Sequence, residues 1–165
     1  MTQRLRYVHI VNSWHPNVRL VEVNGSNWRD VAAVKPRPDQ ERFFASVSYY
    51  LCLAHYGDTW HPLAVEVGGS VVGHVMWAID DEDGSVWLGG LVIDGSAQGG
   101  GIGRAAVAAF LERFTEEGQV NVALSYSPDN TIARRLYAGI GFAETGEVEG
   151  DEIVARYQQT STGES

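Results

Sequence analysis

Leu91-Val-Ile-Asp-Gly-Ser-Ala-Gln-Gly-Gly-Gly-Ile-Gly-Arg104 is the stretch of this sequence that decides the fold. It predicts a short apolar strand, then a glycine-rich turn, then the first turn of a helix. Glycine allows positive φ angles and lets the backbone approach a ligand closely. The helix that follows directs unpaired N–H groups and the positive end of its dipole toward the turn. We therefore expect an anion site here, most naturally for a pyrophosphate group.

Three other interpretations of the glycine turn fit the sequence less well. A plain flexible loop would not need glycine at four of the five positions 99–103, because glycine destabilises a helix start. Residues 101–106 match the dinucleotide pattern G-x-G-x-x-A, but the strand expected at 120–126 has no acidic residue for a ribose hydroxyl. A P-loop requires Gly-Lys-Ser or Gly-Lys-Thr, and no such tripeptide follows.

Composition limits the functional classes further. The chain has 165 residues, of which 44% are hydrophobic and 20% charged, and this fits one globular domain with a sizeable core. A net charge of −9 disfavours nonspecific nucleic-acid binding and attracts a cationic small substrate. No apolar stretch reaches the roughly 20 residues of a membrane span, and the N-terminus lacks the apolar core of a signal peptide. We expect neither a nucleic acid nor a membrane as partner.

Cys52 is the single cysteine of the chain, so an intrachain disulfide is impossible. A reducing compartment, and hence a cytoplasmic location, is expected. Because residues 49–54 form an apolar run, we expect a buried and unreactive thiol.

Hydrophobic periodicity predicts a mixed α/β (α+β) domain. Strands are expected at 18–23, 63–67, 71–79, 86–93, 120–126 and 153–157, with another starting at residue 142; helices are expected at 28–34, 43–56, 101–117 and 128–137. The helix between the strands at 86–93 and 120–126 makes those two strands parallel. The remaining strands should be mostly antiparallel, with helices on both faces of the sheet. The domain is expected to span residues 17–158, between an N-terminal extension (1–16) and a polar tail (159–165).

A second group of residues follows the strand expected at 120–126. Asn130 stands where the next helix begins and is a suitable N-cap. Residues 130, 133 and 137 share one helical face. Tyr137 on that face fits plain core packing. It also fits a general acid, because a phenol keeps its proton at neutral pH.

Together the two groups resemble the GNAT superfamily of acetyl-CoA-dependent N-acetyltransferases. Gln98-x-x-Gly101-x-Gly103 is similar to the family's pyrophosphate motif, and Asn130 to Tyr137 followed by Gly141-Phe142 is similar to its second cofactor motif. The resemblance covers residues 17–158. Within the family, the chain looks most like the spermine/spermidine (diamine) acetyltransferase branch. The resemblance implies a GNAT fold, with a mostly antiparallel central sheet and one splayed parallel strand pair.

The resemblance also implies site roles. Backbone groups of Leu91, Val92 and Ile93 would pair with the pantetheine arm, and a backbone N–H near Leu91–Val92 would meet the oxyanion. Gly89-Gly90 would form the bulge that splays the strands. Asn130 would bind the cofactor, and Tyr137 would protonate the departing thiolate. A homodimer is implied as well. The pyrophosphate would be held by Gln98, Gly99, Gly100, Gly101, Ile102, Gly103 and Arg104.

Two features depart from the family pattern. The turn has glycine where the family often has a basic or bulky residue, so Arg104, Arg134 or Arg135 would have to complement the phosphates. Gly89 also stands where polyamine acetyltransferases often carry a carboxylate. The amine of a polyamine is protonated at pH 7, so a base is needed, and the candidates are Glu152, Glu147, Asp80 and His74, with Glu152 preferred. Trp60, Trp77 and Trp87 could line an amine pocket or belong to the core.

The sequence thus predicts an acetyl-CoA-dependent transferase, without a metal, that acetylates a primary amine of a small molecule by direct attack in a ternary complex. A polyamine-like molecule is the preferred acceptor. An antibiotic amine, a protein amino group, and a noncatalytic acetyl-CoA-binding module stay open as alternatives.

Overall fold

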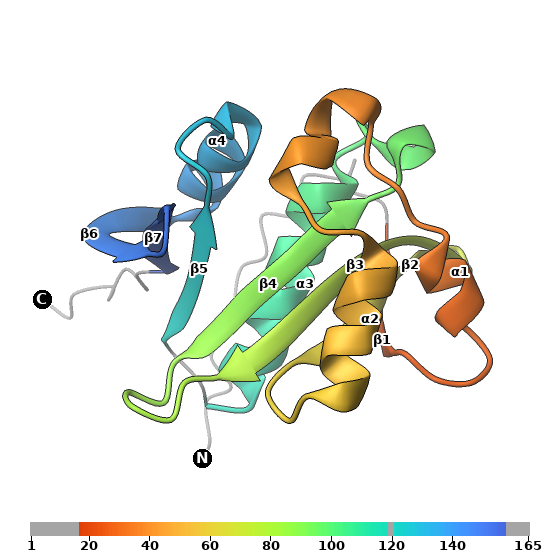
Figure 1. Ribbon diagram of the computed structural model, residues 1–165, viewed down its shortest axis with the longest axis horizontal. Helices are drawn as coiled ribbons and strands as arrows, with labels where there is room; N and C mark the ends of the chain where they lie inside the picture. Colours follow the sequence, from red (N-terminus) through yellow and green to blue (C-terminus); the bar gives the residue numbers. More distant parts are fainter. Residues whose placement is uncertain (1–16, 119–120, 158–165) are drawn as a thin grey trace, which may run out of the picture.

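The computed structural model describes residues 17–118 and 121–157 as a single sheet covered by helices (Figure 1). The predicted extension (1–16) and tail (159–165) lie outside the described residues, as does Val120. The elements follow in the order expected from the sequence, with two short 3-10 helices (η) added. They are β1 (Val18–Glu22), α1 (Trp28–Ala32), η1 (Pro38–Phe43), α2 (Val47–Tyr56), β2 (His61–Val67), β3 (Ser70–Ile79), β4 (Val86–Ile93), η2 (Gly95–Ala97), α3 (Ile102–Glu116), β5 (Val122–Tyr126), α4 (Thr131–Ile140), β6 (Phe142–Glu149) and β7 (Glu152–Tyr157).

The sheet order is β1-β2-β3-β4-β5-β7-β6. Among the described strands, β4 and β5 form the one parallel pair, and they pair through Val86 with Val122 and Trp87 with Ala123. Beyond these residues the two strands diverge, as Figure 1 shows. The predicted mixed sheet, with its splayed parallel pair, is confirmed. Two halves of the sheet, β1 to β4 and β5 to β6, therefore meet along a very short seam.

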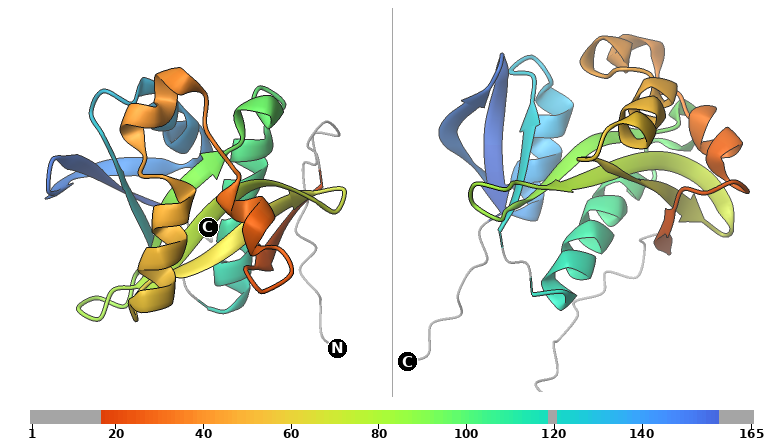
Figure 2. Two further views of the ribbon diagram at one scale, coloured as in Figure 1. Left: turned by 45° about the vertical axis from the view of Figure 1, so that its right-hand side comes forward. Right: turned by 60° about the horizontal axis from the view of Figure 1, so that its bottom comes forward.

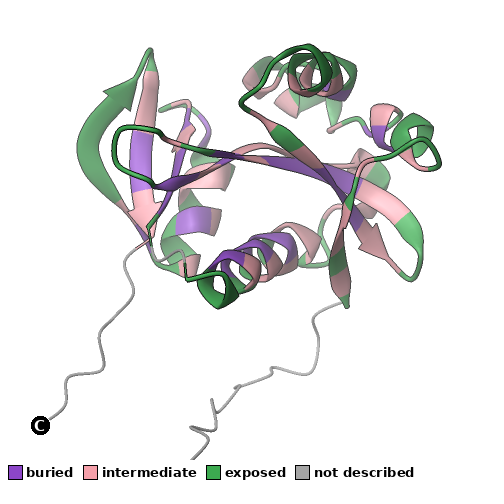
Figure 3. Ribbon diagram, turned by 90° about the horizontal axis from the view of Figure 1, so that it is seen from below, coloured by how far each residue is buried: buried purple, intermediate pink, exposed green. Residues whose placement is uncertain are grey.

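Helices cover both faces of the sheet (Figure 2). On one face, α3 and α4 bury a core that contains Val75, Phe110 and Tyr137. On the other, α1 and α2 cover a smaller core that contains Val31 and Val92. Figure 3 shows buried residues along the central strands and on the inner side of α3. Side chains alternate between faces along a strand, which is why the two cores share the same strands.

Two helix boundaries differ from the prediction. The helix expected at 43–56 begins at Val47, where the Ser46 side chain accepts from the Tyr49 N–H at 3.1 Å, and residues 38–43 form η1 instead. The helix expected at 128–137 begins at Thr131 and continues to Ile140, so Gly139 lies inside it. Side-chain caps on Ser46 and Asn130 set the N-terminal ends of these two helices, and Gly141, with a φ of +124°, ends α4.

The prediction of a buried Cys52 is wrong, because its side chain is exposed. The apolar run at 49–54 supplies both sides of α2. Val47 and Leu51 pack toward the sheet, whereas Cys52 lies on the outer side together with the exposed Tyr49. An apolar run on a helix is not a buried face unless it repeats every three to four residues.

No helix in the described ranges is both long and apolar enough to cross a bilayer.

Candidate functional site

The divergence of β4 and β5 leaves one edge of β4 without a partner strand. Register pairs Gly73 with Ile93 and His74 with Val92, and the Asp94 N–H donates to Val72 O at 2.8 Å. Because hydrogen-bonded pairs alternate along an antiparallel ladder, Val92 directs its backbone groups to β3, and Leu91 and Ile93 direct theirs to the opposite edge. The Gln98 side chain, which donates to Ile93 O at 2.8 Å, lies on that edge.

A bulge in β4 sits beside this edge. Between the pairs His74–Val92 and Met76–Gly89, β4 has one residue more than β3. Gly90, inside the bulge, has a φ of +56°, which favours glycine. The extra residue reverses the alternation: Val86 and Leu88 face α3, whereas Val92 faces α2. The predicted bulge is confirmed, but it lies at Gly90 and Leu91, because Gly89 still pairs with Met76.

The glycine turn lies between β4 and α3. Gly99 and Gly101 have φ angles of +90° and +79°, and Gly101 is the N-cap of α3. Since Gly101 has no side chain to cap the helix, the first amides of α3 remain available to a ligand. Gln98 Nε2 also donates to Gln40 Oε1 at 2.8 Å, which ties the turn to η1.

A cleft of about 930 Å³ runs along the open edge of β4 and past the glycine turn. Twelve of the thirteen residues expected in the site from the sequence line it. Gly100 does not, because it is exposed on the outer side of the turn. The residues that line it are Leu91, Val92, Ile93, Gln98, Gly99, Gly101, Ile102, Gly103, Arg104, Asn130, Tyr137 and Glu152.

Of the three arginines expected to complement the phosphates, one lines the cleft and two do not. Arg104 lines the cleft and donates from Nη2 to Gly139 O at 3.1 Å, so α4 holds its guanidinium in place. Arg134 is instead paired with Glu144 at 2.6 Å and is not among the residues that line the cleft, and neither is Arg135. Arg104 therefore has the most suitable position of the three.

Two α4 residues face the cleft from the side of the diverging β5. Asn130 Oδ1 accepts from the Ala133 N–H at 3.1 Å, so the predicted cap is confirmed. Tyr137 is buried, and its ring stacks on Tyr126 with centroids 5.9 Å apart. Burial, followed by the nearby Tyr126 and Glu152, raises the pKa of the Tyr137 phenol above its usual value. The phenol therefore carries its proton at neutral pH.

Glu152 lies at the start of β7, next to β5. Its Oε2 accepts a hydrogen bond from Ser125 Oγ at 2.6 Å. Both residues line the cleft, and so does Tyr137. A carboxylate and a phenol thus face one cleft from neighbouring elements, which is an arrangement suited to proton transfer.

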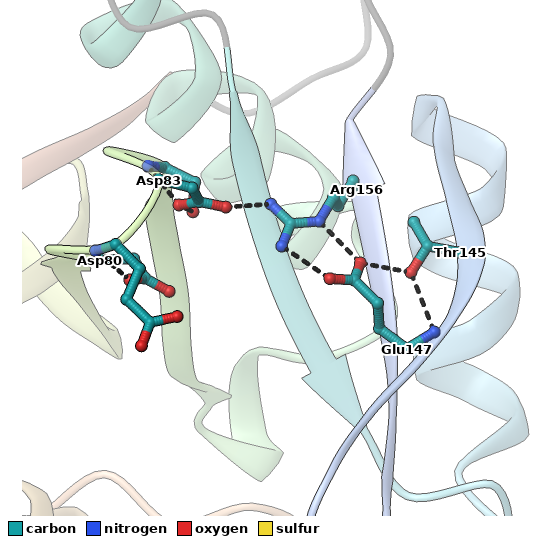
Figure 4. Close-up of polar contacts among 7 residues, drawn as sticks. Asp80, Asp83, Thr145, Glu147 and Arg156 are labelled. Carbon is teal, nitrogen blue, oxygen red and sulfur yellow. Dashed lines mark hydrogen bonds and ion pairs between the residues drawn. The ribbon is translucent and has the colours of Figure 1, made fainter.

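The other candidate bases are placed less favourably. Glu147 is absent from the cleft lining: Arg156 donates to it at 2.9 and 3.1 Å and to Asp83 at 3.2 Å (Figure 4). These hydrogen bonds lower the pKa of Glu147 to about 2, so it is a poor proton acceptor. His74 is fully buried behind the bulge and does not line the cleft. Asp80 lines it, at the turn between β3 and β4.

Carboxylates dominate the charged lining of the cleft outside the glycine turn. Two hairpins supply them: Asp80, Asp81 and Glu82 lie in the turn between β3 and β4, Glu149 ends β6, and Glu152 begins β7. At Gly89, where the resemblance led us to expect a carboxylate, the cleft has an aromatic surface. Trp60 lies against Gly89, and Trp87 lines the same cleft. Trp77 instead packs against Phe114 beneath the sheet and belongs to the core.

Several lining residues were missed from the sequence. Ser125 alternates with two buried strand residues, which in retrospect places it on the open side of β5. Tyr50 follows Val47 by three residues, and this helical spacing could have placed it on the inner side of α2. Gln40, Phe43 and Phe44 lie in or beside η1, and no periodic pattern marks them.

Known proteins resemble this chain in sequence and in fold. The spermine/spermidine N(1)-acetyltransferase of Bacillus subtilis (strain 168) is 29% identical over 111 residues, which cover 62% of this chain and 71% of the relative. This match agrees with the predicted resemblance to that branch. Among solved structures, the aminoglycoside acetyltransferase AAC(6')-Ib in complex with coenzyme A has a TM-score of 0.71 at 20% identity and covers 87% of this chain and 95% of its own. The spermidine N-acetyltransferase from Vibrio cholerae, in complex with CoA and spermine, has a TM-score of 0.64 at 20% identity and covers 88% and 94%.

These TM-scores show that the chain shares its overall fold with both structures. The model of the Acetyltransferase (GNAT) family matches residues 21–142, most of the chain. The chain belongs to the GNAT family of acetyltransferases.

Proposed function

We propose that this acetyltransferase uses acetyl-CoA to acetylate a primary amine of a small polycationic molecule, with linear polyamines as the first candidates. One observation carries the proposal: a single cleft joins an anion-binding helix start to a group of five carboxylates. The first half suits a pyrophosphate, and the second suits several ammonium groups.

The cofactor half is built from backbone. The free edge of β4 at Leu91 and Ile93 offers N–H and C=O groups in strand geometry, which suits the amides of a pantetheine arm. The amides at the start of α3 suit the pyrophosphate, with Arg104 adding a positive charge. Asn130 would act mainly through its amide nitrogen, because its Oδ1 already caps α4.

The acceptor half combines charge with an aromatic surface. Asp80, Asp81, Glu82, Glu149 and Glu152 would bind ammonium groups spaced along a chain. Trp60 and Trp87 offer ring faces to the same cations. The net charge of −9 adds a long-range attraction. The names of the matched relatives, spermine/spermidine and spermidine acetyltransferases, support the same substrate class.

The chemistry needs three proton movements. An alkylamine with a pKa near 10 is about one part in a thousand free base at pH 7, so Glu152 would accept a proton from the ammonium group. The amine nitrogen then attacks the thioester carbonyl carbon, and the Leu91 N–H stabilises the oxyanion. When the carbon–sulfur bond breaks, Tyr137 protonates the thiolate, and the second proton lost from the attacking nitrogen restores the phenol. The products are the N-acetylated amine and CoA, and Glu152 releases its proton to solvent.

Acetyl-CoA consumption against a panel of amines tests the proposal. The panel contains spermine, spermidine, short diamines, aminoglycosides, amino acids and a lysine peptide. Saturable turnover that favours polyamines supports it. A preference for aminoglycosides would show that the proposed substrate class is wrong and that the proposed reaction is right. Tight acetyl-CoA binding without turnover on any amine would overturn the proposal in favour of a binding module.

A further inference from the structure

The peptide between Gly90 and Leu91 lies at a point where the backbone is poorly constrained. Two residues of β4, Gly90 and Leu91, stand opposite Val75 alone, so the regular ladder does not fix them. Turning this peptide plane over changes ψ of Gly90, which glycine tolerates, and φ of Leu91, which a leucine side chain resists. Neither effect fixes the finer tilt of the plane, so a contact outside the ladder is needed to set it.

His74 makes the contact that does so. Its Nδ1 lies 2.7 Å from Gly90 O. A carbonyl oxygen can only accept, so Nδ1 carries the proton and donates. His74 is fully buried, and its Nε2 finds no partner within the described residues. Burial lowers the pKa of His74 to about 4, in agreement with a neutral ring.

Tyr50 fixes the orientation of the imidazole. The two rings stack with centroids 5.6 Å apart and an angle of 2° between their planes. The Tyr50 hydroxyl accepts from the Ala45 N–H at 3.1 Å, which anchors the phenol ring in turn. The histidine is therefore held between α2 and β4, and its proton points at one carbonyl.

The direction of the Gly90 carbonyl also fixes the direction of the Leu91 N–H. All described peptides are trans, so the Leu91 N–H points away from the Gly90 carbonyl. With that carbonyl turned to His74, the N–H points to the open edge of β4, in agreement with the alternation of the ladder. A reversed peptide would place a carbonyl oxygen there and repel a developing negative charge.

We infer that His74 is a positioning residue, which holds the Gly90–Leu91 peptide so that the Leu91 N–H meets the thioester oxygen. This inference rests on the proposed function. His74 touches neither cofactor nor amine, and it acts through one backbone hydrogen bond.

Two substitutions separate positioning from packing. His74→Leu fills the same buried space with an apolar side chain of similar length and removes the Nδ1–H donor. His74→Asn keeps an N–H near the place of Nδ1. We expect His74→Leu to lower kcat by about 100-fold, the scale of losing one oxyanion donor, with little change in KM for acetyl-CoA. His74→Asn should recover at least a tenth of the wild-type kcat. Equal kcat in wild type and a folded His74→Leu would overturn the inference.

A spectroscopic measurement needs no acceptor. Acetyl-CoA labelled with carbon-13 at the acetyl carbonyl should show a carbonyl stretch that shifts to lower frequency on binding the wild-type protein. In His74→Leu the shift should be smaller, and in His74→Asn it should return. An unchanged band in His74→Leu would contradict the inference even if turnover fell. Absence of acetyl-CoA binding by the wild-type protein would count against the proposed function instead.

The wild-type protein provides a third test, in case His74→Leu does not fold. Nitrogen-15 NMR of the histidine rings distinguishes the two neutral tautomers, and His74 is assigned as the signal lost in His74→Asn. We expect the proton on Nδ1 of His74 at pH 7. A proton on Nε2 would overturn the inference, because a bare Nδ1 cannot donate to the Gly90 carbonyl.

Discussion

Trp60 lies so close to Gly89 that a β-carbon at position 89 would be 2.8 Å from Cζ3 of the indole ring. The ring therefore occupies the space into which a side chain on β4 would project. The missing carboxylate at this position and the tryptophan in the preceding loop are two parts of one arrangement. At this point the cleft is lined by an aromatic ring and not by a side chain on β4.

Replacing Trp60 by leucine should weaken binding of the acceptor amine and not of the cofactor. Loss of a cation–π contact of about 0.5–2 kcal/mol predicts a rise of roughly 2- to 30-fold in KM for a polyamine. Initial rates at varied amine and fixed acetyl-CoA measure it. Trp60→Phe, which keeps a ring face, is the matched control. A change in KM for acetyl-CoA alone would refute this role.

Tyr137→Phe removes one oxygen from a buried ring and should leave the fold intact. If the phenol protonates the thiolate, kcat should fall by about 100-fold or more. Binding of acetyl-CoA, measured by calorimetry, should stay within about two-fold of wild type. A Tyr137→Phe enzyme with unchanged kcat would show that the thiolate leaves without this proton.

Glu152→Gln should lower kcat/KM for the amine by about 100-fold at neutral pH, because an amide cannot accept the ammonium proton. Raising the pH toward 10 should restore part of the rate, since the free amine then becomes abundant. Ser125→Ala, which removes the 2.6 Å hydrogen bond to Glu152, should have a smaller effect. Glu149→Gln, in the same cleft, serves as the control. An equal loss in Glu149→Gln would point to general charge rather than to a base.

His74 should make the protein sensitive to acid. Its pKa falls from 6.5 to about 4 in the folded chain, because burial disfavours the charged ring. Above pH 6.5 neither state binds a proton there. Between pH 6.5 and 4 the unfolded chain binds it and the folded chain does not, so the free energy of unfolding falls as pH falls, by roughly 3 kcal/mol in total.

Urea unfolding of wild type and His74→Asn at pH 7 and pH 4.5 measures this contribution. The carboxylates common to both proteins cancel in the comparison. The loss of stability on acidification should be smaller in His74→Asn. Equal losses would mean that the ring becomes protonated without unfolding.

Much of this architecture could be predicted because its determinants are local. The glycine turn at 99–103 and the Asn130 cap each follow from a few neighbouring residues, and so does the order of strands and helices. The parallel direction of β4 and β5 followed from the helix that connects them. The bulge near Gly89-Gly90 was instead implied by the resemblance to the GNAT family, and the register of β3 and β4 places it at Gly90 and Leu91.

The rest depended on contacts between distant segments. Gln40, Phe43 and Phe44 enter the cleft from the segment before α2, and no pattern near them in the sequence indicates this. Glu147 was a reasonable candidate base until Arg156, nine residues away, was found to bind it. Cys52 was misjudged because apolar neighbours in sequence lie on opposite sides of a helix.

The exposed Cys52 has a practical consequence for work on this enzyme. Reagents that detect the thiol of released CoA will also react with this side chain, so each protein molecule adds one equivalent to the signal at time zero. Cys52→Ser removes that background. The same thiol, unique in the chain, accepts a single fluorophore on the outer side of the helix that carries Tyr50. A label there can report, in a stopped-flow instrument, on cofactor and amine arriving beneath that helix.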